Sequence, residues 1–116
     1  MNKRTAARLE SYEHRYRDLA AQVASVGYIA SGSLAPRLTR CGRTNCSCAS
    51  DPKRRHGPYW HLTATVEGKT VNRRLSANEA ELYEGWIANN RKVQALLDEM
   101  RALAAKAAEL ILADLD

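Results

Sequence analysis

The chain has 116 residues, which is the size of one small domain, and 45% of them are hydrophobic although phenylalanine is absent. Leu, Ala and Val make up most of the apolar content, which favours helices packed along narrow seams over a thick core. We see neither a signal peptide nor a segment that could cross a bilayer, so we expect a cytoplasmic protein with no membrane partner and with reduced thiols.

The net charge of +5 is concentrated in the middle of the chain. Residues 27–76 carry nine basic and two acidic side chains, a net charge of +7, whereas residues 1–26 carry +2 and residues 77–116 carry −4. Localised positive charge is typical of proteins that bind a phosphate backbone. An ordinary solvated surface gives the same pattern, so charge alone does not establish a nucleic-acid partner.

Apolar residues at steps of three and four predict two helices with heptad seams. In the first helix, residues 1–26, the seam is Leu9, Tyr12, Tyr16, Leu19, Val23 and Val26, with Gly27 at the expected C-cap. In the second helix, residues 77–116, it is Leu82, Trp86, Asn89, Val93, Leu96, Met100, Leu103, Ala107 and Leu110. Ser76 and Glu79 have the spacing of a capping box that begins the second helix.

The second helix is the longer of the two, so we expect an antiparallel pair to leave its C-terminal half without a partner in the same chain. An exposed apolar stripe on that overhang predicts a homodimer through the C-terminal helix, in the manner of a coiled coil. Asn89 on the seam would then fix the register.

The region between the helices has the pattern of a small antiparallel sheet. A short extended segment near residues 34–40 contains Pro36 and Arg37, and residues 59–75 predict a hairpin about Glu67 and Gly68. A two-residue turn pairs Val66 with Lys69, Thr65 with Thr70, Thr63 with Asn72 and His61 with Arg74. Side-chain alternation then gives an apolar face of Trp60, Leu62, Ala64, Val66, Val71 and Leu75, joined by Arg73, and a polar face of His61, Thr63, Thr65, Thr70, Asn72 and Arg74.

All three cysteines lie within one short segment that a histidine follows. Cys41, Cys46, Cys48 and His56 are the ligand types of a closed structural zinc site, so we predict Zn²⁺ as cofactor. His61 is a competing fourth ligand, which we rank lower because it lies within a strand. The segment has little apolar mass, and a metal would supply the folding energy that it lacks.

Other interpretations of the cysteines stay open. Cys46 and Cys48 can form a redox pair, with Arg43 lowering a thiol pKa, but no thioredoxin-like pattern surrounds them. A Cys/His nucleophile would need an orienting group, for which Asp51 is the nearby carboxylate. Buried structural cysteine is the remaining alternative.

A zinc knot would hold a basic loop beside the hairpin, which is an arrangement that suits DNA. We predict phosphate contacts from Arg40, Arg43, Lys53, Arg54 and Arg55, and base-edge contacts from Thr63, Asn72 and Arg74. A two-stranded ribbon fits the major groove. Plain solvent exposure explains the threonines equally well.

Three segments carry a resemblance to a known family: RCGRTNCSCA (residues 40–49), RHGPYW (residues 55–60) and VEGKTVNRRL (residues 66–75). They resemble an uncharacterised family of small bacterial proteins with an R-C-G-[KR]-x-N-C-x-C-A block, then R-H-G-P-Y and a long C-terminal helix. Such proteins are often encoded near transposases and recombinases, which implies a DNA context but proves no activity, and the resemblance supplies no established catalytic residues to carry over. Trp60 stands where tyrosine is more usual and Glu67 where aspartate is. The hairpin and helix also resemble, by fold analogy alone, the arm-binding domains of phage-type integrases.

We therefore predict a single α+β domain: an N-terminal helix, a small three-stranded antiparallel sheet with a zinc knot, and a long C-terminal coiled-coil helix that dimerises. The expected function is non-enzymatic DNA binding, with DNA favoured over RNA, as an accessory or regulatory factor of a mobile element. The alternative is a coiled-coil adaptor that binds a protein partner and uses zinc only as a clasp.

Overall fold

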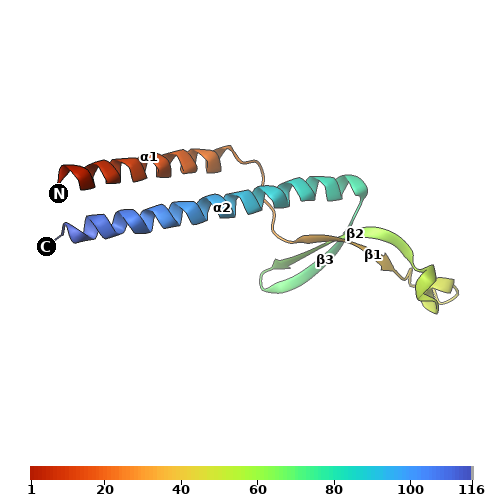
Figure 1. The fold of residues 1–116 in the computed structure, drawn as a ribbon. Coiled ribbons are helices and arrows are strands. Elements are labelled where there is room, and N and C mark those ends of the chain that lie inside the picture. The colour runs from red at the N-terminus through yellow and green to blue at the C-terminus, as the bar shows by residue number, and fades with distance from the viewer. Residues whose placement is uncertain (116) are drawn as a thin grey trace. The chain divides into compact units, whose positions relative to one another are not determined.

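The chain divides into two compact units in its computed structural model, which describes residues 1–115 (Figure 1). The helical unit consists of Met1–Tyr28 and the chain from Asn89 onward, and the sheet unit is Ile29–Ala88. The predicted elements are confirmed: an N-terminal helix, a three-stranded antiparallel sheet and a long C-terminal helix, α2 (Ala77–Ala113), which runs through both units. Within residues 1–115, neither helix has a stretch that is long and apolar enough to cross a membrane.

Helix α1 (Lys3–Ser25) begins and ends with local caps. The Asn2 side chain accepts a hydrogen bond from the Thr5 amide at 2.8 Å, which satisfies one of the free amides of the first turn. The expected C-cap at Gly27 is wrong, because Val26 caps the helix in an extended conformation and no left-handed residue is needed.

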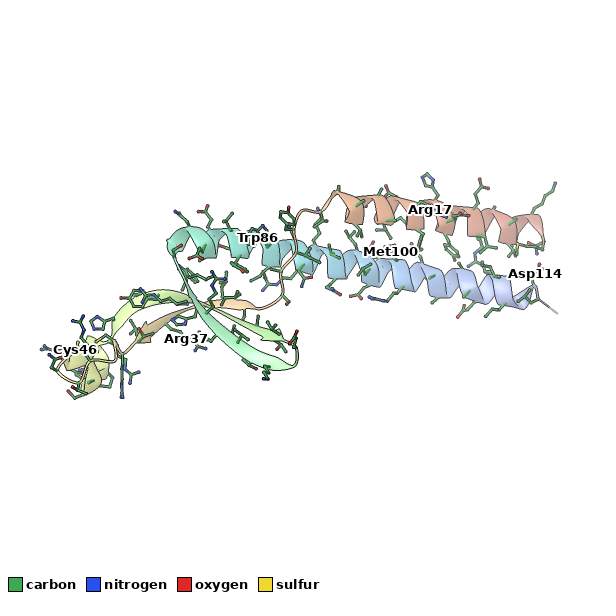
Figure 2. The ribbon with its side chains drawn as sticks, turned by 180° about the vertical axis from the view of Figure 1, so that it is seen from behind. Arg17, Arg37, Cys46, Trp86, Met100 and Asp114 are labelled. Atoms are coloured by element: carbon green, nitrogen blue, oxygen red, sulfur yellow. The ribbon has the colours of Figure 1, made fainter. Side chains whose placement is uncertain are left out.

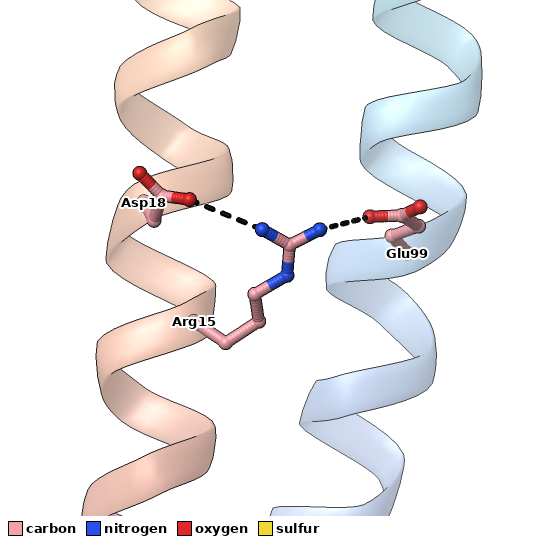
Figure 3. A network of polar contacts seen from close by, with 3 residues as sticks. All are labelled: Arg15, Asp18 and Glu99. Carbon is pink, nitrogen blue, oxygen red and sulfur yellow. Dashed lines mark hydrogen bonds and ion pairs between the residues drawn. The ribbon is translucent and has the colours of Figure 1, made fainter.

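In the helical unit, α1 lies antiparallel to the C-terminal part of α2. The N-terminal ammonium pairs with Asp114 at 3.1 Å, and Arg15 bridges Asp18 at 3.1 Å and Glu99 at 3.3 Å (Figure 3). At the other end of α1, the Asn89 side chain donates to the Tyr28 carbonyl at 2.8 Å. These contacts set the register of the two helices.

The expected overhang is therefore wrong: the C-terminal half of α2 is the part that α1 covers. Residues 77–88 of α2 belong to the sheet unit instead, so the surplus length of the long helix is used at its N-terminal end. The overhang was the reason for expecting a homodimer, so the structure gives no support to a dimer formed in that way.

The sheet has the order β1 (Ser33–Thr39), β2 (His56–Val66), β3 (Lys69–Leu75). All four hairpin pairs expected from the sequence are present, from Val66 with Lys69 to His61 with Arg74. Glu67 and Gly68 both have positive φ, 51° and 78°, as a two-residue turn of the hairpin type requires. Pro36 is accommodated because β1 is an edge strand, which pairs on one side only.

The first turns of α2 cover one face of the sheet. Leu62 and Leu75 are buried there against Ala80 and Ile87. Other members of the predicted apolar face stay outside this core, since Trp60, Val66 and Val71 are 41%, 54% and 45% exposed.

Leu82 is 55% exposed, so its predicted place on the buried seam is wrong. The seam fails here because these turns of α2 pack with Ala80 and Ile87, which lie on a different stripe of the helix.

The predicted capping box at the start of α2 is present. The Glu79 amide donates to Ser76 Oγ and the Ser76 amide donates to Glu79 Oε1, both at 3.1 Å. Arg73 pairs with the other carboxylate oxygen at 3.1 Å. The hydrogen bonds from Ser76, with the Arg73 charge, hold the pKa of Glu79 below its ordinary value.

Replacing Glu79 with glutamine should destabilise the protein at neutral pH and not in acid. A pKa that is lower in the folded state contributes stability above the unfolded pKa, and that stability is lost as pH falls through the folded pKa. The difference in unfolding free energy between Glu79→Gln and the wild type, from denaturant titrations at neutral and acidic pH, should shrink as the carboxylate is protonated. A difference that does not change with pH would contradict this role.

Candidate functional site

The connection between β1 and β2, residues 40–55, brings its three cysteines together with His56, the first residue of β2. Two short 3-10 turns, η1 (Ser47–Ala49) and η2 (Pro52–Arg54), fold it back on itself. The sulfurs of Cys41, Cys46 and Cys48 and a ring nitrogen of His56 all lie within 4.8 Å of one another. Figure 2 labels Cys46 in this connection and Arg37 on the sheet.

The distances between the donor atoms fit a tetrahedral centre. Cys41 Sγ and Cys48 Sγ are 3.5 Å apart, and Cys46 Sγ lies 3.3 Å from His56 Nε2. With ordinary zinc–ligand lengths, the edges of a tetrahedron are ~3.8 Å between sulfurs and ~3.5 Å between sulfur and nitrogen. The four side chains can therefore bind a metal ion.

The three thiols differ in exposure and in acidity. Cys48 is 1% exposed and accepts a hydrogen bond from the Cys41 amide at 3.4 Å. Hydrogen bonds from the backbone and thiol of Cys48 lower the pKa of Cys46. The Cys41 amide lowers the pKa of Cys48, but burial and the neighbouring thiols outweigh it, so the pKa of Cys48 is raised. Three thiolates this close repel one another, and a bound cation would keep all three ionised.

An irregularity in the pairing of β1 with β2 places His56 beside the cysteines. Arg37 pairs with Tyr59, but Thr39 pairs with His56, so β2 has one more residue than β1 between these pairs. Gly57 lies in this bulge with φ 113°, and a Cβ there would lie 2.8 Å from the Tyr59 nitrogen and 2.9 Å from the Arg37 oxygen. The bulge therefore requires glycine.

Gly57→Ala should destabilise the protein more than Gly68→Ala, its matched control. Both glycines have positive φ, so each substitution carries a backbone cost of roughly 1 kcal/mol, but only Gly57 also meets backbone atoms. Denaturant titration of both variants would measure the difference. Equal losses of unfolding free energy would show that the bulge can relax around a methyl group.

The five predicted phosphate contacts lie in the same connection as the sulfurs. Arg40, Arg43, Lys53 and Arg54 are exposed, and Arg43 lines a hollow of about 490 Å³ together with Cys46 and His56. Arg55 is half-buried, and its Nε has no hydrogen-bond partner within residues 1–115.

Asp51 does not orient His56, which weakens the nucleophile interpretation. Its carboxylate accepts from the Lys53 amide at 3.0 Å and lies 3.6 Å from Arg54 Nε, so it caps the turn η2. Asp51 therefore does not serve as the orienting carboxylate that a Cys46–His56 nucleophile would need.

The three predicted base-edge contacts lie on the face of the sheet that α2 does not cover. Asn72 links two neighbours, since its Oδ1 lies 2.7 Å from His61 Nδ1 and its Nδ2 donates to Thr63 Oγ1 at 3.2 Å. His61, the competing fourth ligand, belongs to this network and not to the metal cluster. The Arg74 guanidinium lies 3.4 Å from the centre of the Tyr59 ring. These contacts hold His61, Thr63, Asn72 and Arg74 against their neighbours on this face.

Arg37 and Tyr59 belong to this face and were missing from the residues predicted to bind nucleic acid. Pro36 made the first strand look interrupted, so its pairing with β2, and hence the face of Arg37, could not be assigned from the sequence. Residues paired directly across antiparallel strands share a face, so the uncovered face consists of Ser33, Ala35, Arg37, Tyr59, His61, Thr63, Thr65, Thr70, Asn72 and Arg74. This set, which we call the open face, contains no acidic residue.

Comparison with known protein families gives one match, which covers the residues of the sheet and of the cysteine cluster. The family model described as a domain of unknown function, DUF6788, matches residues 9–84. No curated protein and no solved structure matches the chain. The analogy to integrase arm-binding domains stays a prediction.

Proposed function

The chain belongs to the DUF6788 family, whose function is unknown, and we propose from its own residues that it is a non-enzymatic DNA-binding protein stabilised by zinc. The observation that carries this proposal is the open face: an exposed, acid-free surface with arginines on two strands. The basic connection at residues 40–55 extends that positive surface. The resemblance to proteins encoded near transposases suggests an accessory or regulatory role in a mobile element.

Zinc is the metal that the donor set favours. Three thiolates and one imidazole form a closed set with no position left for a substrate, which is typical of structural zinc and not of catalytic zinc. Apart from Cys48, no residue in 40–55 is buried, so this connection has almost no core of its own. Ion binding would supply its folding energy.

The purified protein should contain one zinc ion per chain, measured by elemental analysis. Its thiols should react with a thiol reagent only after a chelator is added, because zinc-bound sulfur is protected. Cys48→Ser and His56→Ala should lower the zinc content. His61→Ala is the matched control and should leave it unchanged, and loss of zinc in that variant alone would contradict the assigned ligand set.

The open face suits duplex DNA through the hydrogen-bond donors of Arg74 and Asn72. Arg74 stacked on Tyr59 keeps the in-plane N–H groups of the guanidinium available, which is how arginine binds guanine or phosphate. Asn72 keeps one amide hydrogen and one lone pair after its two contacts, which are the groups that bind adenine. The major groove of B-form DNA admits a β-ribbon, whereas that of A-form RNA is too narrow for side chains, so we favour DNA.

Binding to a duplex should weaken steeply between about 50 and 200 mM salt if several phosphates are neutralised. Arg37→Ala and Arg74→Ala should each reduce affinity, and a residue that contacts phosphate should lower the salt slope by about 1. Arg15→Ala is the control, because Arg15 pairs with Asp18 and Glu99 in the helical unit. Affinity that is independent of salt, or an equal loss for all three variants, would contradict this interface.

The alternative function, a protein-interaction adaptor, predicts a different result from charge reversal. Replacing Lys53, Arg54 and Arg55 with glutamate should abolish the DNA shift if the basic connection contacts phosphates. In an adaptor the same variant would still bind its protein partner, and the wild type would show no salt-dependent DNA affinity.

A further inference from the structure

A hollow of about 560 Å³ lies within the sheet unit, where β3 ends and the chain turns into α2. The pairing of β2 with β3 stops at Trp60 and Leu75, so β2 continues to His56 without a β3 partner. The lining of the hollow includes Pro58, Tyr59, Trp60, Arg74 and Leu75. It therefore combines residues of the open face, Tyr59 and Arg74, with residues of the face that α2 covers.

Trp60 is a large side chain of this hollow that α2 leaves partly uncovered. It shares a face with Leu62 and Leu75, yet those two are 8% and 3% exposed and Trp60 is 41% exposed. The helix covers the sheet through Ala80 and Ile87, and the core that results does not include Trp60. The indole therefore remains accessible to a ligand, to which its flat and rigid ring offers a large contact area.

The part of the hollow that belongs to the open face carries a positive charge. The Arg74 guanidinium is exposed and lies 3.4 Å from the centre of the Tyr59 ring. The neighbouring Arg73 pairs with Glu79 at 3.1 Å, whereas no carboxylate within residues 1–115 pairs with Arg74. The hollow thus places an accessible aromatic ring near a guanidinium whose charge the chain does not neutralise.

These two groups select a ligand that has flat apolar faces and a negative charge. A cation, which aromatic side chains can also bind, would be repelled by Arg74. A nucleotide uses both groups, because its base can stack on the indole of Trp60 while its phosphate accepts hydrogen bonds from the guanidinium. Within a duplex the neighbouring bases cover both faces of a base, so a base must leave the stack before it can lie on a side chain.

We propose that this hollow binds one unpaired nucleotide beside a duplex, with its base on Trp60 and its phosphate at Arg74. The inference rests on the proposed DNA binding and deepens it, because Arg74 also belongs to the open face that would contact the duplex. The preferred ligand is then DNA in which a paired segment meets an unpaired one, and not a continuous duplex.

Three DNA ligands that share one duplex sequence test this preference: a blunt duplex, the duplex with a forked end in which both strands are unpaired, and the same fork with abasic nucleotides in its unpaired strands. The wild type should bind the fork with bases at least about fivefold more tightly than the abasic fork, which is the gain expected from stacking one base. The abasic fork keeps its phosphates, so the difference between the two forks measures the contribution of the bases. Fluorescence anisotropy of labelled DNA at one salt concentration gives the dissociation constants.

Trp60→Leu should bind the two forks equally, because leucine keeps an apolar side chain but has no ring on which a base can stack. Trp60→Phe should keep a measurable preference for the fork with bases. Val66→Ala is the matched control, since Val66 is 54% exposed on the same strand and does not line the hollow, and it should keep the full preference. Far-UV circular dichroism and zinc content check that each variant is folded.

The fluorescence of Trp60 gives a second measurement. Trp86→Phe leaves Trp60 as the only tryptophan of the chain. Its emission should fall when the fork with bases binds and should change much less with the abasic fork, because a base stacked on an indole quenches its fluorescence.

Equal affinity of the wild type for the two forks, or a preference that Trp60→Leu retains, would overturn the proposal. Neither result affects the proposed function, which requires only salt-dependent affinity for the blunt duplex. Absence of binding to all three DNA ligands would overturn both.

Discussion

The burial of Leu62 and Leu75 beneath Ala80 and Ile87 determines which face of the sheet is buried and which is exposed. Side chains alternate between the two faces of a strand, so covering one face with α2 commits the other face to solvent. For that reason Arg37 and Arg74 are exposed to solvent, and Tyr59 lies half-buried beside them. The hydrophobic contact at one face thus creates the polar surface at the other.

The far end of the sheet needs a different source of order. Around residues 40–55 only Cys48 is buried, and the chain there is largely short turns and charged side chains. Buried apolar side chains hold the strands together where α2 covers them. At the other end of the sheet, the metal-ligating atoms of the cysteines and His56 come together instead. The bulge at Gly57 connects these two parts of the sheet unit. It shifts the strand pairing by one residue, so that His56 of β2 reaches the cysteine sulfurs.

The hairpin and the ligand cluster could be predicted from the sequence because each is encoded locally. Strict alternation about Glu67 and Gly68 allows one register, and four close donors have few ways to converge. The antiparallel pairing of the two helices was predicted correctly, but the end of α2 that α1 covers was not. Periodicity marks an apolar stripe on a helix without saying what that stripe packs against. Leu82 fits the heptad, yet the sheet selects Ala80 and Ile87 instead. The role of Arg37 was hidden for a similar reason, since pairing between distant strands leaves no local pattern.

The long connection also determines how well the sheet is protected from other chains. Strand β1 covers one edge of β2 and contains Pro36, which lacks the amide that an incoming strand would use. Strand β1 is held to β2 by pairing from Ser33 to Thr39, and the connection at residues 40–55 closes one end of that pairing. If the connection opened, the pairing would fray from that end and expose backbone groups of β2. Such an edge invites association between chains through strand pairing. We therefore expect the cysteine segment to protect this strand edge as well as to shape the connection, and its unfolding to favour aggregation.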